Sequence, residues 1–574
     1  MRPPGRLGKA LALAFGVTWL AVLIRWWPMT QFAVWGSDQG EYASLMESFM
    51  RSGGQLPSNY QGWGTGYPDF AGMYSLAGTF AAIAGVDSFV ALSIVVPAAA
   101  GLTALMTFAI TLRLSQSLRA STLAGAIVAF AMPEAFAGSH GMPGALGGLF
   151  FVGALLAVAV AARSPAARWV TIIAVVALVP THHLSAYMVA LALSLVALAE
   201  ARLGPADLAR SRIVDSAFAG ASAAALLSTF FWAIGAPHFR AGILDPISRT
   251  LALALPGAAL LGMVALMVLI WWMEERPRLA RSRLSLADEG KTLSRLGIAV
   301  LSAVATVVVV ATIGVPGTSA VVDPVVALSF LPLAVVLACA AGGPGRLAPA
   351  RGSTVPFAAA GAILLGALFG ALTVPTILLP YRHMQYFVEA AAPLAAVALA
   401  FAARSVALTV LPERPRVHRP LFAILLALLV ASCAISTYPE KSALGGFQEG
   451  TTSWEIASVV WYTSFVPRHT IVSDHRLSSL VFGFSNQKAT WDSGGPVFYG
   501  NSTTALAALS NVATPTGPSS ASSVLITEDI IQGAALSQWA PALPITGDAL
   551  LKFEHRPFIK AFDNGDAVVY WVAK

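Results

Sequence analysis

Residues 145–162 read ALGGLFFVGALLAVAVAA, an apolar run without a single charged side chain. About 20 apolar residues in an α-helix are enough to cross the hydrocarbon layer of a bilayer. The segment must be a helix there, because a backbone exposed to lipid has to satisfy its own hydrogen bonds. The run therefore predicts a membrane-spanning helix.

Similar runs recur along the first three quarters of the chain. Of the 574 residues, 57% are hydrophobic and 11% charged, whereas a soluble domain carries roughly 25% charged residues. The composition predicts a mainly α-helical, polytopic membrane bundle. About thirteen spans are expected, at residues 8–27, 88–112, 120–137, 145–162, 168–181, 184–201, 213–235, 251–273, 295–313, 325–341, 355–376, 384–403 and 420–437. Two of them, 168–181 and 184–201, are short, and we expect 68–84 to be re-entrant or interfacial.

The basic residues predict the orientation of this bundle. With the N-terminus in the cytoplasm, about 22 Lys or Arg side chains fall in inner segments and about 5 in outer ones before residue 438. Because the positive charges lie in short loops, the net charge of +7 does not indicate a nucleic-acid partner. We expect a multi-pass plasma-membrane protein with its C-terminal part on the extracytoplasmic side.

The character of the sequence changes near Tyr438. Charged residues, Asn, Ser and Thr return, and short alternating segments such as 567–570 are typical of strands. The chain is therefore expected to have a transmembrane domain, residues 1–437, and an extracytoplasmic mixed α/β domain, residues 438–574. Cys339 and Cys433 both fall within apolar runs, so we interpret them as core thiols.

The first outer loop carries two acids, Asp38 and Glu41, in the sequence WGSDQGEY of residues 35–42. They are three positions apart, so on a helix both carboxylates lie on one face. Such a pair can hold a hard divalent cation or share proton transfer. The alternative is that they are ordinary first-turn acids that cap a helix.

Further ionisable side chains fall in the other outer loops. Glu134 and His140 lie in the second loop, His182 follows in the sequence Thr-His-His, and Arg382 and His383 precede a late helix. Neighbouring histidines point in different directions on a helix, so the His pair is a poor metal site. Arg382 could bind phosphate oxygens with its fork of donors, or it could anchor the helix at the interface.

Together these motifs resemble the GT-C superfamily of membrane glycosyltransferases. The resemblance rests on the acidic motif of residues 37–42 after the first helix, Tyr67-Pro68 before an interfacial segment, Thr181-His182 above two short helices, and Pro380-Tyr381-Arg382 before a late helix. The layout is most similar to the oligosaccharyltransferase catalytic subunit, with thirteen helices and an outer C-terminal domain. Its Trp-Trp-Asp-Tyr-Gly acceptor motif is absent, and Asp474 falls near the position of the motif's aspartate.

The resemblance implies inverting transfer of a sugar or glycan from a polyprenyl-phosphate-linked donor to a glycan, lipid or protein acceptor. Asp38 would be the catalytic base or a ligand of Mg²⁺ or Mn²⁺, and Glu41 would support it. Binding of the donor phosphate or substrate is expected at Arg382, His182, His140, Glu134, Tyr67 and His383. Asp474 would lie on the acceptor side, and the protein would also contact membrane lipids.

Two other classes of function remain open. A non-enzymatic translocator or export factor for lipid-linked glycans could have the same number of helices, although we find no internal repeat of the transporter kind. A structural membrane subunit is the other alternative. The sequence contains no phosphate-binding Lys loop, HExxH or CxxC motif, so nucleotide hydrolysis, zinc proteolysis and redox chemistry have no support.

Overall fold

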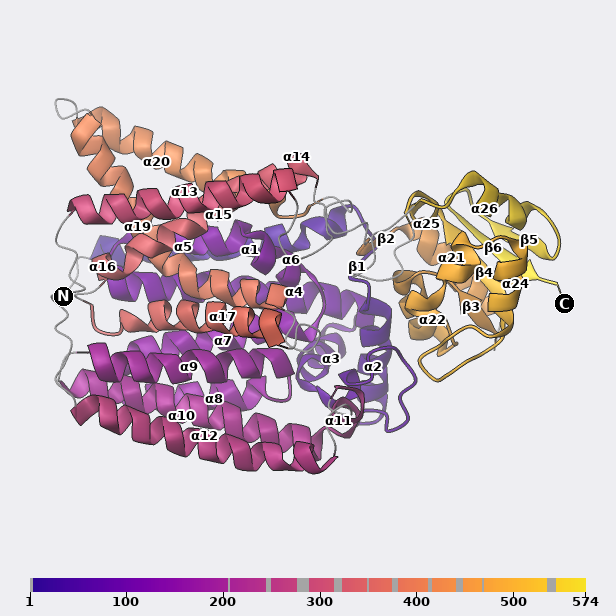
Figure 1. The fold of residues 1–574 in the computed structure, drawn as a ribbon, viewed down its shortest axis with the longest axis horizontal. Helices are drawn as coiled ribbons and strands as arrows, with labels where there is room; N and C mark the ends of the chain where they lie inside the picture. The colour runs from indigo at the N-terminus through magenta and orange to yellow at the C-terminus, as the bar shows by residue number, and fades with distance from the viewer. Residues whose placement is uncertain are drawn as a thin grey trace. The chain divides into compact units, whose positions relative to one another are not determined.

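The computed structural model describes residues 4–204, 207–243, 249–275, 289–313, 323–347, 350–373, 380–410, 415–439, 448–466, 469–533 and 544–573. Two compact units emerge from the contacts along the chain. The first comprises Met1–Arg25, Ala98–Gly138 and Pro143–Tyr438; the second comprises Trp26–Pro97, Ser139–Met142 and Pro439–Lys574. Figure 1 colours the chain from its N-terminus to its C-terminus, so that the segments of each unit can be followed.

The first unit is a bundle of helices, and three of its helices, α1, α4 and α6, have residues in the second unit as well. Its helices are α1 (Pro4–Trp26), α4 (Ser88–Ser115), α5 (Leu118–Phe130), α6 (Met132–Ser139), α7 (Pro143–Ala161), α8 (Ala167–Leu178), α9 (His183–Leu203), α10 (Leu208–Phe230), α11 (Pro237–Ile243), α12 (Arg249–Glu275), α13 (Glu289–Ile313), α14 (Pro324–Ser329), α15 (Leu331–Ala338), α16 (Gly343–Leu347), α17 (Thr354–Thr373), α19 (His383–Val410) and α20 (Pro415–Ser432). Short 3₁₀ or π turns follow several of them, at Phe231–Gly235, Cys339–Gly342, Pro380–Arg382 and Cys433–Ser436.

The chain is a multi-pass integral membrane protein, and each of the thirteen predicted segments contains a helix. Among the described residues, ten helices are long and apolar enough to span a bilayer. An eleventh span is counted if α5 and α6, bent by 58° at Ala131, are taken as one. The predicted number of thirteen is therefore not confirmed. The remaining two segments are the 12-residue α8 and the short apolar stretch Leu426–Ser436.

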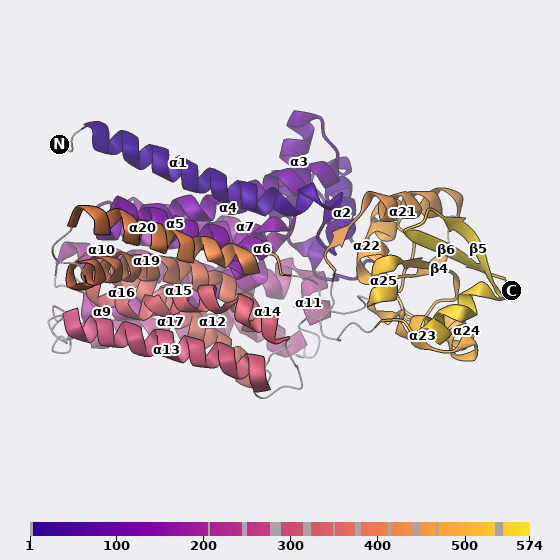
Figure 2. The ribbon, with the colours of Figure 1, turned by 90° about the horizontal axis from the view of Figure 1, so that it is seen from above.

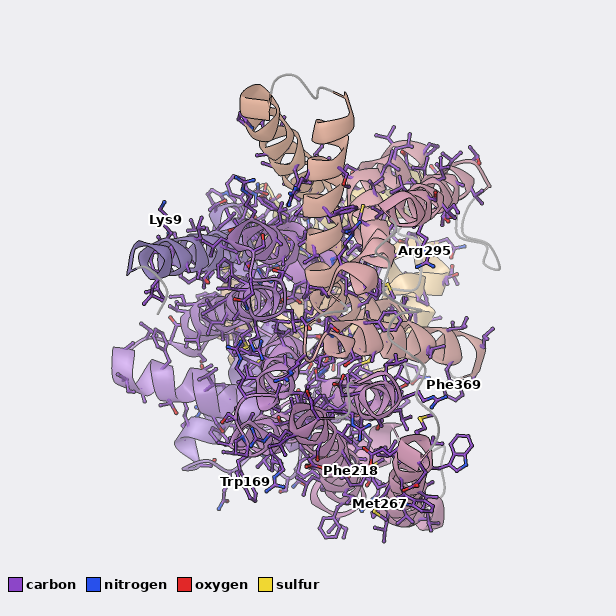
Figure 3. The ribbon with its side chains drawn as sticks, turned by 90° about the vertical axis from the view of Figure 1, so that its left-hand side faces the viewer. Lys9, Trp169, Phe218, Met267, Arg295 and Phe369 are labelled. Carbon is purple, nitrogen blue, oxygen red and sulfur yellow. The ribbon has the colours of Figure 1, made fainter. Side chains whose placement is uncertain are left out.

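Large apolar side chains cover the outside of this bundle. Trp169, Met267 and Phe369 are each more than half exposed and lie at its perimeter in the end-on view of Figure 3. In a soluble protein such a surface would be unstable, but in a membrane it contacts lipid. The bundle therefore has an apolar outer surface suited to a membrane.

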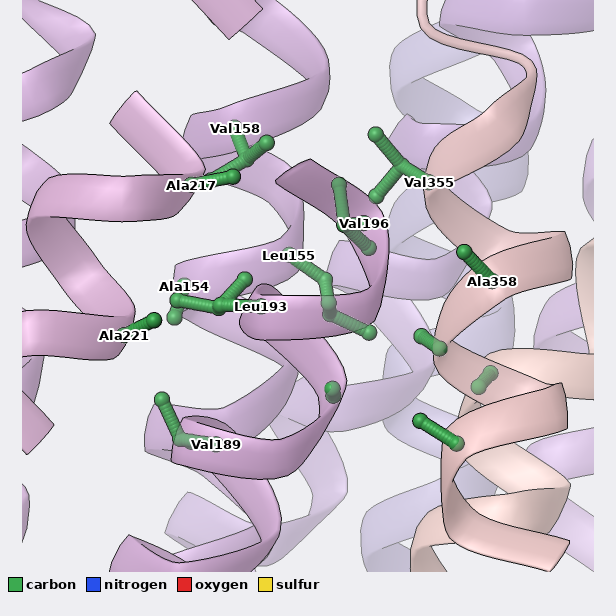
Figure 4. Close-up of a cluster of buried hydrophobic side chains, with 14 of the residues drawn as sticks. Ala154, Leu155, Val158, Val189, Leu193, Val196, Ala217, Ala221, Val355 and Ala358 are labelled. Carbon is green, nitrogen blue, oxygen red and sulfur yellow. The ribbon is translucent and has the colours of Figure 1, made fainter. Parts of the chain in front are cut away.

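Small side chains allow the helices to approach closely inside the bundle. Figure 4 shows part of this core, in which Ala217 and Ala221 of α10 face the side chains of α7 and α9, and Val355 and Ala358 extend from α17. Small residues at helix interfaces are the usual way in which membrane helices pack. Cys339 and Cys433 are buried, free thiols, as predicted.

The second unit combines helices with two sheets. Its helices are α2 (Gln39–Arg51), α3 (Gly72–Ala84), α21 (Ser453–Phe465), α22 (His475–Ser485), α23 (Gly495–Tyr499), α24 (Ser502–Ser510), α25 (Glu528–Gln532) and α26 (Gly547–Leu551), with 3₁₀ turns at Trp27–Thr30, Tyr67–Asp69, Trp491–Ser493 and Lys552–Glu554. Its strands are β1 (Val34–Trp35), β2 (Gly450–Thr451), β3 (Thr470–Val472), β4 (Ala521–Thr527), β5 (Phe558–Asp563) and β6 (Ala567–Val572).

The larger sheet has the order β3-β4-β6-β5, with β3 and β4 parallel and the other pairs antiparallel. All seven residues of β4 are buried, because this central strand is covered by helices on both faces. Figure 2 shows α21 on one side of the sheet and α23 and α24 on the other. The predicted mixed α/β character of the C-terminal part is therefore confirmed.

The second unit also includes the first outer loop. The sequence predicts a division at residues 437 and 438, and the second unit indeed resumes at Pro439, but it additionally contains Trp26–Pro97 and Ser139–Met142. The smaller sheet joins these parts, because Val34 and Trp35 of β1 pair with Thr451 and Gly450 of β2. The acidic motif of the first loop thus belongs to the same compact unit as the C-terminal residues.

Helices α2 and α22 cross at two glycines. A Cβ atom added at Gly40 would overlap the carbonyl group of Ser479, and one added at Gly483 would overlap the backbone of Gly40. The two backbones therefore approach more closely than any other residue type would allow.

We expect Gly40→Ala to destabilise the second unit by about 1–3 kcal/mol, the usual cost of inserting a methyl group into a closely packed contact. The measurement is the thermal unfolding midpoint of the full chain in detergent. Gly547→Ala is the matched control, because a Cβ at this exposed position would meet no atom within 4 Å. Equal midpoints for the two variants would contradict the close crossing.

Candidate active site in the second unit

Asp38 stands at the N-cap of α2, yet its side chain makes no capping hydrogen bond. Instead its carboxylate accepts two hydrogen bonds from distant residues. His475 Nε2 lies 2.8 Å from Oδ1, and the Tyr67 hydroxyl donates to Oδ2 over 3.0 Å. The side chain of Asp38 remains 21% exposed, so the carboxylate is held in place but still accessible.

His475 is the first residue of α22, and it joins two carboxylates. Its Nδ1 lies 2.8 Å from Asp492 Oδ1, opposite the contact to Asp38, and its ring packs edge-on against Trp63 and Trp491. Burial disfavours the charged imidazolium, but the hydrogen bonds and charges of the two aspartates outweigh it and raise the pKa of His475 well above its usual value. The ring is therefore a cation between two anions.

Glu41 lies one turn beyond Asp38 and is completely buried. Its Oε1 accepts hydrogen bonds from the Tyr60 hydroxyl and, over 2.8 Å, from the Gly64 N–H. Burial, and then the negative charge of Asp38, raise the pKa of Glu41 to about 8. At neutral pH this carboxyl therefore favours its protonated form.

The loop above these acids contains two glycines that let it approach them. A Cβ at Gly62 would overlap Glu41 and Tyr60, and one at Gly64 would overlap the ring of Tyr67. Between them Trp63 contacts His475 with its ring edge, at 4.8 Å between centroids, and is 44% exposed. The loop thus presents one large aromatic side chain beside the acidic centre.

His140 lies in the same unit and pairs with Glu449. Its Nε2 is 3.5 Å from Glu449 Oε2, and the Ser37 N–H donates to the same oxygen over 2.9 Å. Burial alone would raise the pKa of Glu449, but His140 and this N–H lower it. This pair fixes the backbone of the residue that precedes Asp38.

Asp474 has both carboxylate oxygens engaged within a buried ion cluster. It caps α22 by accepting from the Leu477 N–H over 2.9 Å, and Arg476 Nε donates to its other oxygen over 3.0 Å. Arg476 also binds Glu455. Burial raises the pKa of Asp474 more than Arg476 lowers it. The predicted acceptor-side role of Asp474 stays a prediction. In the structure Asp474 caps α22 and pairs with Arg476.

Glu134 belongs to the first unit, where it forms a fully buried ion pair. Arg25 donates to its Oε1 over 2.8 Å, and the Thr103 hydroxyl donates to the same oxygen over 2.9 Å. Both charged side chains are completely inaccessible, and Glu134 lies in the first turn of the short helix α6. The contacts give Glu134 a role in joining α1, α4 and α6.

The other predicted residues of the first unit gather around the starts of α9 and α19. His182 caps α9 and contacts the hydroxyl of Ser185, which in turn contacts Tyr386. His383 is buried edge-on to Tyr187, and Arg382 Nε donates to the Tyr381 hydroxyl over 3.2 Å. These residues share one unit with Glu134, and their predicted substrate-binding roles stay predictions.

Of the nine predicted site residues, the structure brings Asp38 and Tyr67 into direct contact, and Glu41 lies one helical turn from Asp38 in the same unit. Sequence reasoning missed His475 and Tyr60, which bind Asp38 and Glu41. It also missed Asp492, which binds His475, and Glu449, which pairs with His140. The sequence DHR at residues 474–476 drew attention only to Asp474. The signal for His475 is indirect: the acids of the first loop need a nearby positive charge, and His475 can supply one.

The predicted divalent cation has a poor set of donors here. Both oxygens of Asp38 already accept hydrogen bonds, and Glu41 is neutral at pH 7. Among the described residues, no group of three or more His, Cys, Asp or Glu side chains is placed to hold a metal ion. Because Mg²⁺ prefers an octahedron of oxygen ligands, the residues present do not fit it.

The chain was compared with known proteins at three levels. No protein-family model and no curated protein matches it. Among solved structures, the apo oligosaccharyltransferase of Archaeoglobus fulgidus matches with a TM-score of 0.58 at 14% identity, covering 98% of this chain and 74% of that one. The archaeal oligosaccharyltransferase AglB from the same organism, in complex with an inhibitory peptide and a dolichol-phosphate, has a TM-score of 0.58 at 12% identity, covering 100% and 75%.

A third structure, ArnT from Cupriavidus metallidurans bound to undecaprenyl phosphate, aligns over 99% of this chain and 98% of that one at 13% identity, with a TM-score of 0.36. The spans and the soluble helices and sheet define a polytopic membrane protein with an attached α/β unit. More particularly, it shares the fold of the archaeal oligosaccharyltransferase, and this similarity extends over nearly the whole chain. The resemblance predicted from the sequence is confirmed at the level of the fold.

The raised pKa of Glu41 makes stability depend on pH. Between pH 4.5 and about 8 the folded protein keeps a proton that the unfolded chain has lost, so stability falls as the pH rises through this window. We expect Glu41→Gln, which retains an acceptor oxygen, to remove a slope of at most about 1.4 kcal/mol per pH unit. Thermal midpoints from pH 5 to 8 test this, with the exposed Glu554→Gln as control; an unchanged slope in Glu41→Gln would refute it.

The buried pair of the first unit predicts a second stability effect. Glu134→Ala leaves the Arg25 guanidinium buried without its carboxylate, which should cost about 3–5 kcal/mol. Replacing both residues, as in Arg25→Met with Glu134→Met, removes both charges and should recover most of that loss. Unfolding midpoints in detergent measure both effects, and a double variant as unstable as Glu134→Ala would exclude a charge-pairing role.

Proposed function

We propose that this protein is a glycosyltransferase that moves a sugar or glycan from a polyprenyl-phosphate-linked donor to an acceptor on the extracytoplasmic face, with inversion at the anomeric carbon. The observation that supports it best is the accessible carboxylate of Asp38, fixed by His475 and Tyr67 beside the protonated Glu41. One ionised and one neutral carboxyl at close quarters is an arrangement suited to proton transfer. The similarity of the fold to GT-C glycosyltransferases also supports a sugar-transfer reaction.

In the proposed reaction Asp38 acts as the general base. It accepts the proton from an acceptor hydroxyl or amide as that group attacks the anomeric carbon of the donor. The new bond to the sugar forms while the bond between the anomeric carbon and the phosphate oxygen breaks, and the electron pair remains on the polyprenyl phosphate. An ionised carboxylate offers about four acceptor sites, so its bonds to His475 and Tyr67 are compatible with a role as proton acceptor.

The residues of the first unit supply the phosphate-binding part of the proposal. Arg382 carries a planar set of donors suited to phosphate oxygens, and His182 and His383 lie in the same unit. Their task would be to neutralise the negative charge that develops on the leaving phosphate. AglB was solved with a dolichol-phosphate, and by analogy we propose a polyprenyl phosphate as the carrier for this chain. The sugar and the acceptor are left open.

Asp38→Asn tests the central role. The amide cannot accept the acceptor's proton as a carboxylate does, so kcat should fall by about 10²–10⁴, the usual contribution of a general base. The assay uses full-length protein in lipid vesicles with a panel of polyprenyl-phosphate-linked sugars, and measures release of the lipid phosphate. Asp548→Asn, an exposed acid of the same unit, is the control and should retain full activity.

The same assay separates the rival functions. If no donor in the panel is consumed while labelled glycan crosses the bilayer, the translocator explains the protein better. If neither process occurs and Asp38→Asn changes neither stability nor assembly, the structural subunit is favoured. Consumption of the donor with retention of anomeric configuration would contradict the single-displacement mechanism.

The exposed ring of Trp63 predicts a contact with the sugar. An aromatic face beside the acidic centre can stack on the apolar face of a pyranose ring, a contact worth about 1 kcal/mol. We therefore expect Trp63→Ala to raise KM for the donor about five- to tenfold, while Trp63→Phe has a smaller effect. Trp454→Ala, which alters a still more exposed tryptophan, is the control. If Trp63→Leu performs like the wild type, the ring serves only as an apolar anchor.

A further inference from the structure

We propose that the proposed transfer reaction needs no divalent cation, because the His475 side chain occupies the space between Asp38 and Asp492 where such an ion would be bound. The inference rests on the proposed function for its chemistry. Its main measurement, however, is metal binding by the wild-type protein, which can be made whether or not the reaction is found.

The first argument is the state of Asp38. Its two oxygens have separate hydrogen-bond donors, His475 Nε2 at 2.8 Å and the Tyr67 hydroxyl at 3.0 Å. A Mg²⁺ ion would have to approach one of these oxygens to about 2.0–2.1 Å and complete an octahedron around itself. The ion would therefore compete for a carboxylate that the imidazole and the phenol already orient.

The second argument is the direction of the donors on His475. Its two ring nitrogens point away from each other, so Asp38 and Asp492 lie at different edges of the ring, each 2.8 Å from its nitrogen. The two carboxylates therefore do not converge on a common point while the ring stands between them. The ring itself is fixed by edge-on contacts with Trp63 and Trp491 and is only 6% exposed.

The third argument concerns Glu41, the other acid of the predicted metal pair. Its Oε1 accepts hydrogen bonds from the Tyr60 hydroxyl and the Gly64 N–H, and its side chain is completely buried. A hard cation needs about six oxygen ligands, often including several waters, so a buried carboxyl that two donors already engage is poorly placed to complete the site.

His475 would then do what a bound ion does for a carboxylate. It supplies positive charge next to Asp38, fixes the direction of the carboxylate and is itself held by Asp492. His475 is therefore a positioning residue that acts through Asp38. Asp492 binds the other ring nitrogen of His475 and so orients the ring, as a carboxylate does for a histidine in other catalytic sites.

Metal content provides the first test. We expect the purified wild-type protein to contain less than 0.1 equivalent of divalent metal, and added Mn²⁺ to show no stoichiometric site by electron paramagnetic resonance. EDTA and 1,10-phenanthroline should change donor consumption by less than twofold. About one equivalent of tightly held metal, whose removal abolishes turnover, would overturn the proposal.

Replacement of the ring provides the second test. His475→Ala should lower kcat at least tenfold with a smaller change in KM, and added imidazole should restore part of the rate where Mg²⁺ and Mn²⁺ do not. His555→Ala, which removes an exposed histidine of the same unit, should behave like the wild type. Rescue by metal rather than by imidazole, or full activity in His475→Ala, would contradict the assignment.

The two tests also separate this inference from the proposed function. If no donor is consumed but Mn²⁺ still finds no site, the transferase assignment fails while the absence of a cation site is supported. If donor is consumed and the wild-type protein requires a bound ion, the function stands and this inference fails. A poorly folded His475→Ala variant affects neither conclusion, because the metal measurement uses the wild-type chain.

Discussion

A charge that leaves water must find its partner inside the protein, and this constraint determines where the ionisable residues of the chain lie. In the membrane-spanning unit Arg25 and Glu134 are completely buried and lie 2.8 Å apart, so each has its counter-charge beside it. In the second unit Arg476 is buried among Glu455, Asp474 and Asp529. His475 follows the same rule with Asp38 and Asp492, but there one anion remains accessible. The candidate site is thus a buried ion cluster that opens on one side.

The membrane-spanning part of the fold could be predicted from the sequence because its signal is local. An apolar run of sufficient length has no soluble alternative, and all thirteen predicted segments contain helices. The predicted number of spans was not confirmed where the apolar helices are only marginally long enough to cross the bilayer. The 12 residues of α8 cover only about 18 Å at 1.5 Å per residue, which is less than the hydrocarbon thickness. The bend between α5 and α6 lies at Ala131, whose backbone is extended. Pro133 favours this break, because it has no N–H to continue the helical hydrogen bonds of α5.

The site was predictable only as far as its residues are near one another in sequence. Asp38 and Glu41 share a helix face, and Tyr67 lies on the same loop, but His475 is 437 positions from Asp38. The choice of Asp474 over His475 has a physical explanation. An N-cap side chain turns back to the helix N–H groups, so the Asp474 carboxylate binds the first turn of α22. The next side chain, at the first helical position, points in another direction and reaches Asp38.

Because His475 is distant from Asp38 in sequence, its position has to be set by tertiary packing. A metal ion can draw several flexible ligands together, whereas an imidazole has two donors in fixed directions. Its position must therefore come from packing, and the contacts of the second unit supply it. Gly40 and Gly483 bring α2 and α22 together, while Gly62 and Gly64 let the loop reach Glu41 and Tyr67. If any of these approaches were lost, Asp38 would keep its sequence context but not its orientation, so the geometry of this centre depends on the tertiary structure of the unit.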